Sequence, residues 1–225
     1  MRVRVFVFAV ILAATASTSL AQTPQRIGRF VFDVRAASAG LPTDEGWVPT
    51  LPLNALAPSR KLGLDAGGHV YLLRLGGATF GVGGTLLFAK GTSVAPEPVS
   101  TSATAPPPVQ TIPDVTTRLK SLSPQVSINF GHAQGWSYLS AGLGTTKVQS
   151  EAVIPSRTTV VFTPRDSGWV KTINFGGGAR WFIKERFGAG FDVRWYKLSL
   201  VPPSATHPGA PRASLFTAGV GITLK

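Results

Sequence analysis

The stretch Asn174-Phe175-Gly176-Gly177-Gly178-Ala179-Arg180-Trp181 alternates apolar residues with polar residues or glycine, and Phe191-Asp192-Val193-Arg194-Trp195-Tyr196 repeats that rhythm. A period of two is typical of a β-strand with one apolar and one polar face. In both segments the polar face carries full charges and the apolar face carries large aromatic side chains. Segments of about ten residues with this pattern, arranged around a lumen, favour a transmembrane β-barrel over a soluble sheet.

Glycines indicate which face points inward. The polar faces near the end of the chain also hold Gly176, Gly178, Gly190, Gly219 and Gly221. Such a glycine-rich set cannot pack a hydrophobic core, as the interior of a soluble, ligand-binding barrel would require. We therefore expect the aromatic faces to point outward into lipid and the charged faces to line the lumen.

The same alternation predicts eight strands along the chain. They lie at about 27–37, 61–73, 80–88, 116–130, 136–149, 169–182, 188–200 and 213–224. Three connections are short turns and four are long loops rich in proline. An even count with short turns at one end and long loops at the other is typical of an outer-membrane barrel. The predicted fold is all-β: an eight-stranded, antiparallel, up-and-down transmembrane β-barrel with both termini in the periplasm.

The first residues have the features of a secretory signal peptide. Arg2 and Arg4 precede an apolar run from Val5 to Ala16, and small residues end at Ala21. A retained membrane helix needs about 20 apolar residues, and this run is interrupted too soon. We expect residues 1–21 to be cleaved and residues 22–225 to form one barrel domain. Residues 91–115, which include three consecutive prolines, are predicted to form a long extracellular loop.

Composition narrows the chemistry. The chain has no cysteine, which excludes disulfides and thiolate metal sites, and a net charge of +12, which implies an anionic partner. Nucleic acid is disfavoured, because no helix, stacking platform or known binding motif accompanies the charge. The basic residues gather at strand ends next to the long loops, where lipopolysaccharide phosphates are the natural partners; simple solubility of strand ends is the alternative. This predicted basic rim comprises Lys61, Lys90, Arg118, Lys120, Lys147, Lys171, Lys197 and Arg212, with Arg60 beside it.

Inward positions supply a second group of polar residues. An eight-stranded barrel is just wide enough for side chains to fill it, and opposite charges in so narrow a lumen are expected to pair. We interpret the group as a structural polar plug; the alternative is a narrow gated pore. Its predicted members are Asp33, Arg35, Asp65, His69, Tyr71, Asn129, Arg180, Asp192 and Arg194.

Aromatic residues are predicted to form two bands at the membrane interfaces, as in known barrels. The predicted girdle comprises Phe30, Phe80, Phe88, Phe130, Trp136, Trp169, Trp181 and Trp195.

The sequence offers no convincing catalytic or metal site. The histidines are His69, His132 and His207, and no two have a ligand-like spacing. His207 is expected on the outer side, where Ser204, Glu151 and Asp166 are candidate neighbours, but no spacing demands a triad. We expect no cofactor and no enzyme activity.

The chain resembles the small outer-membrane barrels of the outer membrane protein A and outer membrane protein X type. The resemblance rests on the signal peptide, on the succession of β-hairpins, and on strands that combine glycine with aromatic residues, such as 176–181. The chain departs from this family in ending Thr223-Leu224-Lys225, where these barrels usually end in an aromatic residue read by the insertion machinery. The resemblance implies an integral protein of the bacterial outer membrane.

These features together predict a monomer with a structural or surface-interaction role. Its expected partners are outer-membrane lipid and lipopolysaccharide, the barrel-assembly machinery, and a surface ligand bound by the loops. A narrow channel for small or apolar solutes is the first alternative, and a lipid-modifying enzyme is the second.

Overall fold

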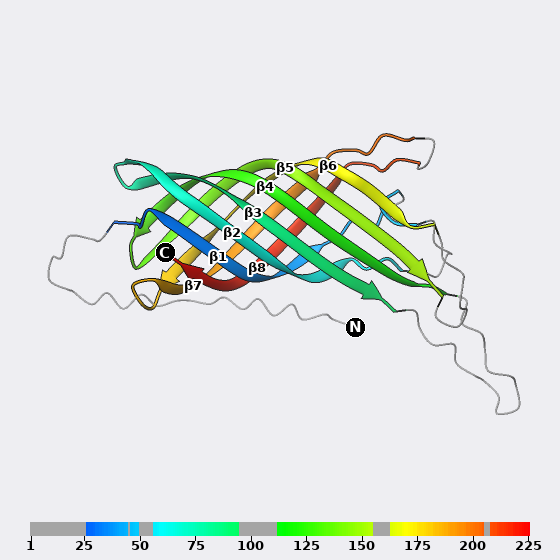
Figure 1. The fold of residues 1–225 in the computed structure, drawn as a ribbon, viewed down its shortest axis with the longest axis horizontal. Helices are drawn as coiled ribbons and strands as arrows, with labels where there is room; N and C mark the ends of the chain where they lie inside the picture. Colours follow the sequence, from blue (N-terminus) through cyan, green and yellow to red (C-terminus); the bar gives the residue numbers. More distant parts are fainter. Residues whose placement is uncertain (1–25, 45, 50–55, 95–111, 155–162, 205–207) are drawn as a thin grey trace, which may run out of the picture.

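The chain folds into a single closed β-barrel (Figure 1). The computed structural model describes residues 26–44, 46–49, 56–94, 112–154, 163–204 and 208–225. Its strands are β1 (Phe30–Gly40), β2 (Arg60–Leu75), β3 (Ala78–Ser93), β4 (Asp114–His132), β5 (Gly135–Val153), β6 (Arg165–Phe182), β7 (Phe187–Leu198) and β8 (Ala213–Leu224). The predicted signal peptide and most of the predicted loop at 91–115 lie outside these described residues.

Each strand pairs antiparallel with the next, and β8 closes the barrel by pairing with β1. The connections β2–β3, β4–β5 and β6–β7 are short and lie at one end, called here the turn end, together with the C-terminus (Figure 1). The four longer connections leave from the opposite, loop end. The prediction of an eight-stranded, up-and-down, antiparallel barrel is confirmed.

Several strands extend beyond their predicted limits at the loop end. Residues 91–93, 114–115, 150–153 and 165–168, which the sequence placed in loops, continue the ladders of β3, β4, β5 and β6. Hydrogen bonding between the strands continues beyond the stretch in which apolar side chains face outward, because threonine and serine side chains also suit a pleated surface. Asp114, Glu151 and Asp166 were therefore wrongly assigned to loops and lie in strands.

The outer surface of the barrel is apolar and its inner surface is polar over the middle of its height. In β1, Phe30, Phe32 and Val34 are exposed on the outside, whereas Asp33 and Arg35 are buried inside. Large exposed hydrophobic side chains also occur on the other seven strands. An apolar belt around a polar interior is the arrangement of a membrane-spanning barrel. No helix in the described part of the chain is long and apolar enough to cross a membrane.

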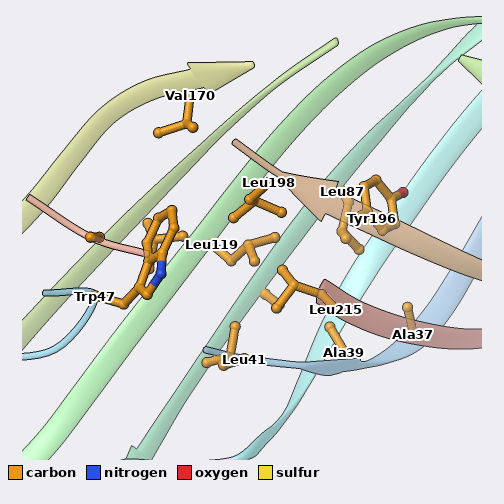
Figure 2. Close-up of a cluster of buried hydrophobic side chains, with 13 residues drawn as sticks. Ala37, Ala39, Leu41, Trp47, Leu87, Leu119, Val170, Tyr196, Leu198 and Leu215 are labelled. Carbon is orange, nitrogen blue, oxygen red and sulfur yellow. The ribbon is translucent and has the colours of Figure 1, made fainter. Parts of the chain in front are cut away.

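The lumen is filled in three layers. At the loop end lies an apolar cluster, and at the turn end lies a smaller, aromatic one. Between them lies a layer of buried charged and polar side chains. The loop-end cluster consists of Ala37, Ala39, Leu41, Trp47, Leu87, Ala89, Leu119, Val148, Val170, Tyr196, Leu198, Ala210 and Leu215 (Figure 2).

Candidate functional site

The middle layer of the lumen is built around buried ion pairs. Arg35 projects inward from β1 and bridges two carboxylates, with N–O distances of 2.7 Å to Asp33 and 2.9 Å to Asp65 of β2. Thr85 of β3 donates a hydrogen bond to the other oxygen of Asp65. Because these side chains are almost fully buried, each charge needs its partners, and their removal leaves an uncompensated charge.

A second arginine binds both carboxylate oxygens of Asp33. Arg180 of β6 donates from Nε at 3.0 Å to Oδ1 and from Nη2 at 2.7 Å to Oδ2. Its guanidinium carbon also lies 3.9 Å from the centroid of the Tyr138 ring. Arg180 is 1% exposed, and this fork links β6 to β1 across the lumen.

A third pair completes the layer. Arg194 of β7 binds both oxygens of Asp192, at 3.1 and 2.9 Å, and also donates to Asn174 and Ser140. Tyr138 of β5 links the two halves: its hydroxyl donates to Asp192 at 2.7 Å and accepts from Arg35 at 3.2 Å.

Three arginines and three aspartates thus form one connected group, called here the lumen network: Asp33, Arg35, Asp65, Tyr138, Arg180, Asp192 and Arg194. Its formal charges balance.

Three predicted lumen residues face inward but stand apart from this network. Asn129 bonds to the Thr79 carbonyl and to Ser127 instead. Tyr71 packs edge-on against Trp136, and His69 is buried nearby. Conversely, Tyr138 was missed by the prediction. It alternates with the outward residue Leu139, so the period of two would have placed it inside.

The loop-end cluster closes the lumen above the network. Trp47, from the segment between β1 and β2, is 1% exposed and packs among aliphatic side chains from the strands (Figure 2). Its indole N–H donates to the carbonyl of Pro211 at 2.9 Å, which ties this segment to the one between β7 and β8. No periodic pattern marks Trp47, so the sequence could not assign it. The predicted plug is polar only in its middle layer.

Trp136 closes the turn end and was wrongly assigned to the aromatic girdle. It is 3% exposed, stacks on Phe182 at 4.8 Å and contacts Tyr71 inside the barrel. Trp136 lies two residues before the inward-facing Tyr138 on β5, and side chains two residues apart on a strand point to the same face.

The rest of the predicted girdle lies on the outer surface. Phe30, Phe130 and Trp181 lie toward the turn end, Trp169 lies toward the loop end, and Phe88 and Trp195 also face outward. Phe80 faces outward but is half-buried.

Seven of the eight predicted rim residues face outward or lie exposed near the loop end. Lys61 is the exception: it is 7% exposed and shares the inward face of β2 with Asp65, so its assignment to the outer rim was wrong. The remaining residues form the basic rim as the structure has it: Lys90, Arg118, Lys120, Lys147, Lys171, Lys197 and Arg212.

Two like-charged pairs sit directly opposite each other within this rim. Lys90 of β3 is in register with Arg118 of β4, and Lys120 of β4 is in register with Lys147 of β5. Carboxylates compensate two of the charges: Glu151 binds Arg118, and Asp166 binds Lys147, each at 2.8 Å. Within the described residues, Lys120, Lys171 and Lys197 have no acidic partner at ion-pair distance.

No group of three or more histidine or acidic side chains in the described residues is arranged to hold a metal ion. His69 lies in the lumen, as predicted, and His132 ends β4 at the turn end. His207 lies outside the described residues.

The fold is that of known outer-membrane barrels. The crystal structure of Neisserial surface protein A superposes with a TM-score of 0.51 at 12% sequence identity, covering 88% of this chain and 97% of that one. Ail of Yersinia pestis matches with a TM-score of 0.49 at 11% sequence identity, covering 88% of this chain and 99% of that one. The N-terminal β-barrel domain of Pseudomonas aeruginosa OprF matches with a TM-score of 0.38 at 14% identity, covering 89% of this chain and 98% of that one. No protein-family model matches the sequence, and no curated protein matches it. The match to Neisserial surface protein A shows a shared barrel fold.

Proposed function

We propose that this eight-stranded barrel is an integral, non-conducting protein of the bacterial outer membrane that acts through its outer surface and its loops. The main support for this proposal is the filled lumen. An apolar cluster, a balanced ion-pair network and an aromatic cluster follow one another along the axis. Such a filled interior supports a structural or surface-interaction role over a channel for small or apolar solutes.

The partner best matched by the basic rim is lipopolysaccharide. Like charges directly opposite each other on neighbouring strands destabilise a sheet, and the rim contains two such pairs, Lys90–Arg118 and Lys120–Lys147. Glu151 and Asp166 compensate one charge of each pair, and phosphate oxygens would bind the other charge, on Lys90 or Lys120, through charge-assisted hydrogen bonds. The rim lies near the loop end, which the proposed topology places at the outer leaflet. We also retain the barrel-assembly machinery as the partner for insertion and the loops as the site for a surface ligand.

The proposal includes removal of the signal peptide. Cleavage after residue 21 would leave one barrel domain, 22–225, with a proline-rich extracellular loop between β3 and β4. The protein would act as a monomer and without a cofactor.

The cysteine-free chain allows a direct test of location and topology. We would introduce single cysteines at Ser199, exposed beyond β7 at the loop end, and at Gln134, exposed in the turn between β4 and β5. A membrane-impermeant maleimide should label Ser199→Cys on intact cells and Gln134→Cys only after lysis. Equal labelling of both in intact cells, or labelling of neither until lysis, would contradict the proposed topology.

A further inference from the structure

The outer wall of the barrel carries a groove of about 680 Å³. It runs over β4, β5, β6 and β7, and its lining is almost entirely apolar. Gly177 and Ala179 provide its floor on β6, while Leu139, Phe175, Phe191 and Trp195 form its sides. Gly177 is required by backbone packing, because a Cβ there would lie 2.5 Å from the carbonyl oxygen of Tyr138. The groove thus follows from the close approach of β5 and β6.

A second groove lies next to the first. It has a volume of about 580 Å³ and extends over β3 to β6, with Val82, Pro124, Leu143 and Ile173 among its lining residues. Val126 and Ala141 line both grooves. The barrel therefore presents two adjoining apolar grooves on the surface that faces lipid.

Lysines stand at the loop-side ends of both grooves. The Lys197 ammonium lies 5.7 Å from the centroid of the Phe175 ring, which forms a side of the first groove. Lys171 precedes Ile173, a side of the second groove, by two residues on the same outward face. Lys120 and Lys147 lie opposite each other, and Lys147 follows Leu143 on the outward face of β5. The grooves and lysines thus form one continuous apolar and cationic surface.

The first groove runs from the cationic rim deep into the apolar band. Lys197 and Phe191 are six residues apart on β7, which is about 20 Å at the usual rise of a strand and about 15 Å along the membrane normal for a tilt of ~40°. That is more than half of the ~25 Å apolar band of an outer-membrane barrel, and Phe191 stacks on Trp181 of the turn-side aromatic band. A groove that begins at a cationic edge and continues into the apolar band suits an acyl chain with an anionic head group.

From these observations we infer that the two grooves and the row Lys120, Lys147, Lys171 and Lys197 form a specific site for a phosphorylated glycolipid with several acyl chains. Each groove holds one acyl chain, and the lysines bind the phosphates. The inference rests on the proposed outer-membrane location and names the lipid site within it. A second copy of the chain fits less well, because two lysine rows would face each other across the interface. Asp166 already compensates Lys147, and a phospholipid with one phosphate offers too little charge for the other three lysines.

The test is lipid binding by the folded barrel in a neutral detergent. Native mass spectrometry would compare purified bis-phosphorylated lipid A, its monophosphorylated form and phosphatidylglycerol at equal concentrations. The wild-type barrel should retain one lipid A molecule and bind the monophosphorylated form and phosphatidylglycerol more weakly. Equal retention of phosphatidylglycerol would overturn the proposed specificity, and retention of a second protein chain on this face would overturn the proposed occupant.

Variants separate the grooves from the general lipid surface. Ala179→Leu adds bulk to the first groove from an outward position, and Lys171→Gln/Lys197→Gln removes two charges. Each should weaken lipid A binding about tenfold or more. The matched controls are Ala36→Leu, outward on β1 and outside both grooves, and Lys184→Gln, exposed between β6 and β7 at the turn end, which should bind as wild type does. If the groove and control variants bind lipid A equally, the site does not exist.

Failure of the site and failure of the proposed function are distinguishable. Each variant is first checked for a heat-dependent shift in gel mobility; if Ala179→Leu does not fold, Ala141→Leu replaces it, because Ala141 lines both grooves. A barrel that shows correct labelling on cells but retains no lipid A contradicts only the site. A chain that folds without detergent or lipid contradicts the proposed membrane location as well.

Discussion

At the residue scale, the sequence predicted which charges face inward but not how they pair. Alternation placed Asp33, Arg35 and Arg180 inside. Their pairing depends on strand register and on closure of the barrel, which bring Asp33 and Arg180 together across 147 positions of sequence. Lys61 and Trp136 were wrongly predicted to face outward. Each lies an even number of residues from an inward neighbour, Asp65 or Tyr138, so the period of two alone places both side chains inside; a rim lysine and a girdle tryptophan were expected from residue type instead.

The ion pairs give the first prediction. In Asp33→Ala, Arg180 loses its carboxylate, and Arg35 keeps only Asp65. Leaving a buried charge unpaired costs about 3 to 5 kcal/mol, and we expect that loss in guanidinium-induced unfolding of the barrel from detergent micelles. The double variant Asp33→Ala/Arg180→Ala should lose less than the sum of the two single losses, because no lone arginine then faces the gap. Additive losses would mean that the pair is not coupled.

Trp47 gives the second prediction at this scale. Trp47→Ala removes the largest side chain of the loop-end cluster and its bond to Pro211, and should lower the free energy of unfolding by about 3 to 5 kcal/mol. Trp169→Ala is the matched control, since Trp169 is 59% exposed on the outer surface, and should cost clearly less. An equal loss in both variants would show that Trp47 does not hold the loop end closed.

At the element scale, the period of two predicted the strands well and their loop-side ends poorly. The outward and inward faces of β1 follow directly from alternation of Phe30, Phe32 and Val34 with charged residues. The ends of β4 and β5 lie beyond the apolar belt, where the alternation is inverted: Val115, Val148 and Ala152 face inward and polar residues face outward. A prediction based on apolar outward faces therefore stopped short of those ends.

The glycines of β6 give the element-scale prediction. A Cβ on Gly178 would lie 2.0 Å from the carbonyl oxygen of Phe191 on β7, so Gly178→Ala forces the two strands apart. We expect a loss of about 3 kcal/mol and a smaller folded fraction, measured by circular dichroism and gel mobility. Gly77→Ala, in the β2–β3 turn where a Cβ meets nothing within 4 Å, should fold as wild type does. If both variants fold equally well, close strand approach at β6 and β7 does not limit stability.

At the scale of the whole molecule, the three layers of the lumen predict a closed barrel. Wild-type protein in planar bilayers should give no single-channel conductance above the bare membrane. Trp47→Ala should remain silent too, because the lumen network still fills the barrel beneath the loop-end cluster. Stepwise conductance in the wild type would reinstate the narrow channel and make the ion pairs candidates for its gate.

The central claim is that the apolar outer surface spans a membrane, and gel mobility tests it most directly. Mature protein folded in detergent would be compared unheated and boiled, with circular dichroism recorded in detergent and in plain buffer. We predict a β spectrum that requires detergent and a change in mobility on boiling, as the closed barrel opens. A β spectrum in plain buffer, with identical mobility before and after boiling, would contradict the claim and indicate a soluble barrel.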